Sequence, residues 1–120
     1  MYSSLVNVDL IALMLRLYIE PLLYNYHVDL NLYGHIHSYE RTCPMYQNRC
    51  VDQGVRHVLL GMGGHDLTYG SYAENPWSIY HDIEFGYTHL IVNKTHLDFS
   101  YYHTFDDRQA ADHFEIVKSS

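Results

Sequence analysis

The feature that most restricts the fold of this chain is a short apolar segment that stops at a glycine and continues into two histidines. The segment from Val28 to Tyr33 resembles a β-strand, and Gly34 interrupts it where a tight turn would begin. His35 and His37 follow in an H-x-H pattern, which places both imidazoles on one face of locally extended backbone. Each imidazole could offer a nitrogen to a metal ion. On spacing alone, the pattern fits a pair of partly buried strand-end histidines that hydrogen-bond to the backbone somewhat better than a metal site.

The residues around the two histidines resemble the last metal-binding motif of the purple acid phosphatases, a family of binuclear metallophosphoesterases. Residues 33–46 read Tyr-Gly-His-Ile-His-Ser-Tyr-Glu-Arg-Thr-Cys-Pro-Met-Tyr, which joins the superfamily pattern Gly-His-x-His to the family pattern Tyr-Glu-Arg. Residues 19–30, 54–64 and 84–90 resemble family segments around this motif, in the same order. Residues 1–4, Met-Tyr-Ser-Ser, resemble the segment just after another metal-binding histidine. We therefore expect the C-terminal part of such an enzyme.

This resemblance implies an α/β fold, or α+β when the chain is taken alone: the C-terminal part of the metallophosphoesterase β-sandwich, flanked by helices. Residues 1–120 would form one part of a catalytic domain. The helix, the strand and the Gly-His-x-His motif would lie in residues 1–53, and the C-terminal strands in residues 54–120. No internal repeat, low-complexity tract or interdomain linker is present in the sequence.

The resemblance also assigns roles to residues of the motif. His35 would bind a divalent metal (Zn, Mn or Fe) and His37 would bind Fe(III), as in an acid phosphatase that hydrolyses phosphate monoesters. Glu40 and Arg41 would orient the histidine turn from behind the ligands. From the residues alone, Glu40 and Arg41 fit an exposed ion pair of little energetic value equally well.

The other metal ligands of the family are absent from this sequence. There is no Gly-Asp-x-x-Tyr and no Gly-Asn-His, and residues 52–54 match Asp-x-Gly only formally, because they follow the histidine motif and fit a turn. We therefore expect the chain alone to be inactive and to need the missing N-terminal part of the same enzyme. The alternatives are a non-catalytic fold or interaction module derived from such an enzyme and, more weakly, a small histidine-rich metal-binding protein.

The two cysteines suggest a compartment. Cys43 and Cys50 flank a turn-prone hexapeptide, and a disulfide there would stabilise the fold by roughly 2.5 kcal/mol in the chain-entropy model. Free thiols are the alternative, and a zinc site would need thiolates that the sequence lacks. The disulfide is favoured and, with the N-glycosylation sequon at Asn93, predicts a secreted or lumenal/vacuolar protein. Residues 1–9 do not resemble a signal peptide.

The formal charge of −7 argues against several partners. The sequence has no basic stripe that could neutralise nucleic-acid phosphates, and it offers no electrostatic attraction to anionic lipid. The apolar run of residues 10–15 is far shorter than the roughly 20 residues that span a membrane. We therefore expect neither nucleic acid nor membrane as a partner. Attraction of an anionic phosphoester would have to come from bound metal.

The hydrophobic pattern predicts the remaining elements. A helix should run from residue 10 to 26, capped by Asp9, kinked or restarted at Pro21, with Leu13 and Leu17 in the core. The glycines of residues 61–64 suggest positive φ or a close approach of the backbone. Strands are predicted at residues 55–60, 87–92, 97–102 and 114–117, with a hairpin turn at 93–96.

Residues 65–81 look like an irregular loop. Within it, His65 and Asp66 would be either a pair beside the substrate or the metal ligands, or part of a solvated turn. Trp77 would either line a cleft or anchor the loop.

Overall fold

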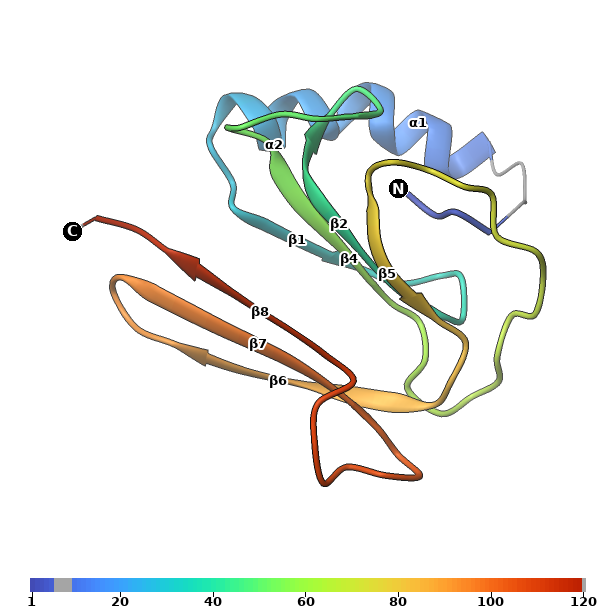
Figure 1. Ribbon diagram of the computed structural model, residues 1–120. Coiled ribbons are helices and arrows are strands. Elements are labelled where there is room, and N and C mark those ends of the chain that lie inside the picture. Colours follow the sequence, from blue (N-terminus) through green and yellow to red (C-terminus); the bar gives the residue numbers. More distant parts are fainter. Residues whose placement is uncertain (6–9, 120) are drawn as a thin grey trace.

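The computed structural model describes residues 1–5 and 10–119, which form three layers (Figure 1). The helices and strands are, in chain order, α1 (Leu10–Tyr18), α2 (Glu20–Asn25), β1 (Leu30–Tyr33), β2 (Tyr39–Tyr46), β3 (Arg49–Cys50), β4 (Val55–Leu60), β5 (Ser78–Asp82), β6 (Gly86–Val92), β7 (His96–His103) and β8 (Asp112–Val117).

The first sheet contains five strands, and its one parallel pair positions the histidine turn. Its order is β1-β4-β2-β3, and β5 pairs with the same edge of β2 as β3 does, near the start of β2, whereas β3 pairs with its end. β1 and β4 are parallel, whereas β2 is antiparallel to β4. Parallel neighbours end at the same edge of a sheet, so the segments that follow β1 and β4 are brought together.

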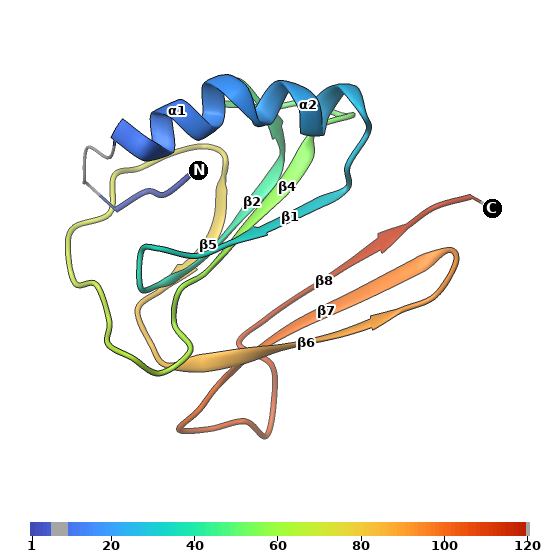
Figure 2. The same ribbon diagram turned by 180° about the vertical axis from the view of Figure 1, so that it is seen from behind.

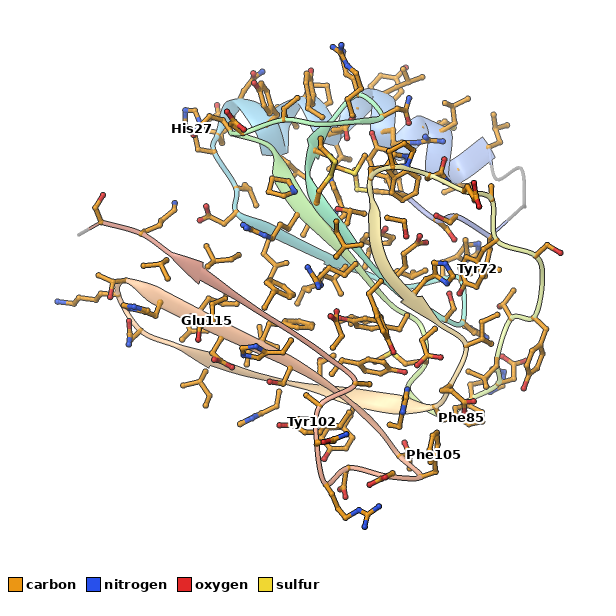
Figure 3. All side chains as sticks on the ribbon, in the orientation of Figure 1. His27, Tyr72, Phe85, Tyr102, Phe105 and Glu115 are labelled. Atoms are coloured by element: carbon orange, nitrogen blue, oxygen red, sulfur yellow. A yellow bond between two sulfur atoms is a disulfide. The ribbon has the colours of Figure 1, made fainter. Side chains whose placement is uncertain are left out.

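The second sheet is an antiparallel meander of β6, β7 and β8. It packs on one face of the first sheet, and α1 and α2 lie over the opposite face (Figures 1 and 2). Side chains fill the space between the sheets (Figure 3). This core consists of Tyr39, Val58, Met62, Phe99, Tyr101, Phe114 and Ile116. The predicted α+β sandwich with flanking helices is therefore confirmed.

The helical region differs from its prediction in one respect. The helix ends at Tyr18 and restarts with Pro21 in the first turn of α2, as expected. The predicted cap, Asp9, lies outside the described residues. Leu13 and Leu17 are 46% and 64% exposed, so their placement in the core was wrong. The helix packs on a single layer, and one side of an all-round apolar helix remains uncovered.

The predicted disulfide between Cys43 and Cys50 is confirmed. It bridges the two strands of the β2–β3 hairpin. Gln47 and Asn48 both have positive φ at the tight turn. Neither strand of this hairpin was predicted from the sequence, which indicated only a turn between the two cysteines. Pro44 made a strand difficult to predict, because it cannot donate to the sheet.

The expected loop of residues 65–81 is also partly wrong. Ser78–Asp82 forms β5, which pairs with β2, so this tertiary pairing overrides a weak local pattern. Trp77 is buried with Tyr2, Cys43 and Met45, and therefore anchors the loop. The 93–96 hairpin turn is confirmed, whereas the last strand begins two residues earlier than predicted.

Candidate metal centre

Residues 34–37 form the turn that joins β1 to β2, at the edge where β1 and β4 both end. His35 has a φ of 90°, in the left-handed region that non-glycine residues seldom adopt. Such backbone strain tends to occur at binding sites. His35 is exposed and lines an open pocket of about 260 Å³, together with Ile11, Tyr33 and Leu59. The first histidine of the motif is therefore accessible to a ligand.

Gly61, directly after β4, fixes the position of the turn. A Cβ atom on Gly61 would lie 1.8 Å from the carbonyl oxygen of Ile36 and 2.9 Å from the Cα of His37. The Gly61 N–H also donates a hydrogen bond of 3.0 Å to the Ser38 carbonyl. The predicted close backbone approach is confirmed, and the predicted positive φ occurs at Gly64 (136°).

The second histidine is held by the segment that follows β4. The His37 N–H donates to the Thr68 hydroxyl at 3.0 Å, and the Thr68 N–H donates back to the His37 carbonyl at 2.9 Å. The His37 Nδ1 contacts the Asp66 carboxylate, and the His65 ring centroid lies 5.7 Å from that of His37. His65 and Asp66 thus lie beside the motif, although both are exposed.

The contact with Asp66 has a consequence for the His37 ring. A carboxylate accepts hydrogen bonds, so the Nδ1 atom of His37 carries the proton and donates the hydrogen bond to Asp66. In a neutral imidazole, this leaves the lone pair on Nε2, which is the form that binds metal. Of the two expectations for Asp66, a residue beside the metal ligands or part of a solvated turn, the contact with His37 favours the first.

The donor set at the turn fits a metal in part. Imidazole and carboxylate, the groups of His37 and Asp66, are ligands that suit iron and zinc. Within residues 1–5 and 10–119, however, no group of three His, Cys, Asp or Glu ligand atoms includes His35 or His37. The turn alone therefore offers fewer ligands than a stable metal site needs.

Glu40 does not form the exposed ion pair with Arg41 that was one of the two expectations. It has no exposed surface, and its carboxylate accepts from the Ser4 N–H at 2.7 Å and from the Ser78 hydroxyl at 2.6 Å. Arg41 binds Asp112 of β8 instead. Both residues therefore hold the first turn-proximal part of β2, which begins at Tyr39, in place.

Two tyrosines near the histidine turn form hydrogen bonds to groups outside the turn. The Tyr39 hydroxyl donates to Asp112 at 2.7 Å, and the Tyr33 hydroxyl bonds to the backbone of Tyr2. Burial raises the pKa of both phenols well above its usual value, which disfavours the tyrosinate form that binds ferric iron.

Two further predicted features lie away from the turn. Asn93 is exposed at the tip of the β6–β7 hairpin, where its side-chain oxygen accepts from the Thr95 and His96 N–H groups, each at 2.9 Å. Residues 52–54 form a turn, closed by a hydrogen bond of 3.0 Å from the Gly54 N–H to the Val51 carbonyl, as expected.

Known sequences similar to this chain are mostly acid phosphatases of one family. The family model described as "Iron/zinc purple acid phosphatase-like protein C" matches residues 54–113. A probable inactive purple acid phosphatase 27 from Arabidopsis thaliana is 39% identical over 82 residues, which is 60% of this chain and 13% of that protein. A nucleotide pyrophosphatase/phosphodiesterase from Hordeum vulgare is 36% identical over 101 residues, which is 75% of this chain and 27% of the relative. Acid phosphatase type 7 from Homo sapiens is 33% identical over 113 residues, which is 83% of this chain and 26% of the human protein.

Solved structures agree with these sequences. The purple acid phosphatase from yellow lupin (Lupinus luteus) seeds superposes with a TM-score of 0.75 at 35% identity, covering 82% of this chain and 19% of the lupin chain. The Plasmodium protein GAP50 shares the fold, with a TM-score of 0.78 at 18% identity over 99% of this chain and 34% of its own. This chain spans only 13% to 27% of the curated relatives described above.

Proposed function

Because the chain belongs to the purple acid phosphatase family, we propose that its histidine turn supplies one ligand to each metal of a binuclear centre that hydrolyses phosphate monoesters. The observation that carries this proposal is the turn itself. His35 is exposed beside an open pocket, and the His37 ring is held through Nδ1 by Asp66. The backbone of Gly61 packs closely against Ile36 and His37 in the same turn.

In this proposal, His35 binds the divalent metal (Zn, Mn or Fe) and His37 binds Fe(III). When bound, the metals would supply charge neutralisation of the phosphoryl group and activation of water. Asp66 holds the proton on Nδ1 of His37, so that Nε2 keeps its lone pair. Glu40 and Arg41 orient the turn indirectly, because they fix the strand that begins directly after it.

The remaining ligands would come from the N-terminal part of the same enzyme, since the described residues of this chain add no third ligand at the turn. The chain would therefore be inactive alone. A phosphate monoester would be drawn to the centre by the metals, because the formal charge of −7 repels anions over the surface as a whole.

We also propose a secreted or lumenal/vacuolar location. The support is the disulfide, which persists in oxidising compartments, and the exposed position of Asn93 in its sequon, where it could carry a glycan. No helix among residues 1–5 and 10–119 has the length and apolar character that crossing a bilayer requires.

The test joins this chain to the N-terminal remainder of the yellow lupin enzyme. We expect the chimera to bind iron and to hydrolyse a chromogenic phosphate monoester at mildly acidic pH. His35→Ala and His37→Ala should each nearly abolish turnover without unfolding the protein, because both side chains lie at an edge turn. Full activity in the double variant would contradict the proposal. The chain alone, with Fe³⁺ and Zn²⁺ added, should show no turnover and no visible tyrosinate band.

A non-catalytic role is the second candidate, because relatives such as the Arabidopsis protein carry the words "probable inactive" in their names. The same chimera separates the two candidates. A folded chimera that binds neither metal, or that binds both metals without turnover, would favour the non-catalytic role.

A further inference from the structure

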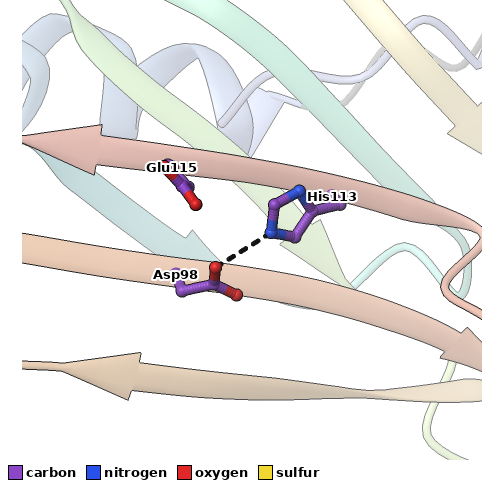
Figure 4. Close-up of side chains that lie close together, drawn as sticks. All are labelled: Asp98, His113 and Glu115. Carbon is purple, nitrogen blue, oxygen red and sulfur yellow. Dashed lines mark hydrogen bonds and ion pairs between the residues drawn. The ribbon is translucent and has the colours of Figure 1, made fainter.

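A second group of metal-ligating side chains lies on the outer face of the second sheet (Figure 4). It consists of Asp98 on β7 with His113 and Glu115 on β8. One ligand atom from each lies within 4.8 Å of the others. The His113 Nε2 is 3.0 Å from the Asp98 Oδ2, and this nitrogen donates the bond. The group belongs neither to the core nor to the histidine turn.

The strand register makes this arrangement electrostatically unfavourable as it stands. Asp98 pairs directly with Glu115 across β7 and β8. Like charges in directly opposed positions of a sheet destabilise it. His113, two residues before Glu115 on β8, hydrogen-bonds to Asp98 but can carry at most one positive charge against the two carboxylates.

No lysine or arginine shares the outer face of these three strands. From the alternation of side chains, this face carries Tyr87, His89, Ile91, His96, Asp98, Ser100, Tyr102, His113, Glu115 and Val117. Arg41, Arg108 and Lys118 each pair with an aspartate elsewhere. The negative charge at Asp98 and Glu115 therefore has no lysine or arginine partner on its own face among the described residues.

We propose that Asp98, His113 and Glu115 form a binding site for a divalent cation of the zinc type on the outer face of the second sheet. A cation would replace the repulsion between the two carboxylates by attraction to a shared charge. The imidazole selects zinc over calcium or magnesium, which prefer shells of oxygen ligands. This inference does not depend on the proposed phosphatase activity.

The geometry needs only a small adjustment. Zinc binds nitrogen and oxygen at about 2.0–2.2 Å, so tetrahedral ligand atoms lie roughly 3.4 Å apart. Glu115 is exposed and has three rotatable bonds, so its carboxylate can close the remaining gap. At His113, the proton moves from Nε2 to Nδ1 as the cation takes its place. Three protein ligands leave a fourth coordination position for water.

The test uses the full chain with His35→Ala and His37→Ala, so that the histidine turn does not compete for the probe. Titration with Zn²⁺ by calorimetry should give one bound ion per chain. His113→Gln and Glu115→Gln should each weaken Zn²⁺ binding at least tenfold. His89→Gln is the matched control, because His89 is exposed on the same face, across Ser100 from His113, and should leave affinity unchanged.

A spectroscopic measurement assigns the site independently of affinity. In NMR spectra, Zn²⁺ should shift the His113 ring signals and the amides of Asp98 and Glu115. Since His113 and Glu115 are exposed, their variants should fold, as circular dichroism would verify. The proposal is overturned if Zn²⁺ does not bind saturably, if both variants bind as tightly as their parent, or if His89→Gln weakens binding equally. A Ca²⁺ titration that matches Zn²⁺ would overturn the selectivity.

Discussion

Arg41 on β2 and Asp112 on β8 form a two-point ion pair that joins the two sheets. The Arg41 Nε donates to Oδ2 at 2.8 Å, and Nη2 donates to Oδ1 at 2.9 Å. The Tyr39 hydroxyl donates to the same carboxylate at 2.7 Å. Asp112 is 8% exposed, Tyr39 is fully buried and the Arg41 side chain is 16% exposed, so the whole group is largely shielded from water. The strand that leaves the histidine turn is thereby tied to the second sheet.

Replacement of Asp112 by Asn should destabilise the fold strongly. It leaves the Arg41 charge without a counter-charge in a largely buried position, and breaking such a pair costs about 3–5 kcal/mol. Urea unfolding would measure the loss. Asp106→Asn is the control, because Asp106 pairs with a mostly exposed arginine and its loss should hardly change the midpoint. Equal effects of the two variants would contradict this account.

Gly61→Ala should displace the histidine turn, since the new methyl group would collide with the Ile36 carbonyl. We expect lower thermal stability and, in the lupin chimera, loss of metal binding. Gly63→Ala is the matched control, because a Cβ at Gly63 meets no atom within 4 Å. Wild-type metal content in the Gly61→Ala chimera would show that the turn does not depend on this contact.

His57 should make stability depend on pH. It is fully buried, and its Nδ1 lies 3.1 Å from the Asn31 amide. Burial, and to a smaller extent the positive charge of the chain's α-amino group, lowers its pKa to about 4. The ionisable side chains that face the ring are Glu20, whose carboxylate lies 3.9 Å from Nε2, and the phenols of Tyr2 and Tyr33.

The folded state should become less stable as the pH falls, because the unfolded chain takes up a proton at His57 more readily. An unfolded histidine has a pKa of about 6.5, so between about pH 6.5 and 4 the unfolded chain binds more protons at His57 than the folded one. The contribution is complete above about pH 6.5 and is lost as the pH falls towards 4, with a size on the order of 3 kcal/mol. Urea midpoints across this range should fall more steeply in the wild type than in His57→Gln. Parallel curves would contradict the prediction.

The disulfide between Cys43 and Cys50 should leave no free thiol in protein purified without reductant. Closing so small a loop contributes roughly 2.5 kcal/mol in the chain-entropy model. We expect Cys43→Ser/Cys50→Ser to lower the free energy of unfolding by about that amount, and reductant to have no effect on the variant. Titration of two thiols in the unreduced, denatured wild type would remove the argument for an oxidising compartment.

The apolar side of α1 should cause the isolated chain to associate. Leu10, Ile11, Leu17 and Tyr18 are each more than 60% exposed, an apolar patch of a kind that seldom faces water. Light scattering should show mass rising with concentration, and Leu17→Glu should reduce it. Ile91→Glu replaces an equally exposed side chain on the second sheet and should leave the association unchanged. A larger effect of Ile91→Glu than of Leu17→Glu would contradict association through α1.

Local pattern was sufficient where a segment carried its own signal. The glycine break before His35, the restart of the helix at Pro21 and the 93–96 turn follow from backbone preferences within a few residues. β5 depends instead on pairing with β2, which no local pattern encodes. The same limit applies to the site. The partnership of Asp66 with His37 spans 29 residues and requires the parallel alignment of β1 and β4.

The two faces of the second sheet differ in how freely evolution can alter them. On the inner face, Phe99 and Phe114 stack at 4.7 Å and any change disturbs the contact with the first sheet. The outer face shares the same strands but supports no packing layer in the described part of the chain. Relatives could therefore exchange its residues without disturbing the core between the two sheets. Divergence among members of this family should concentrate there, and new surface chemistry could arise on an old scaffold.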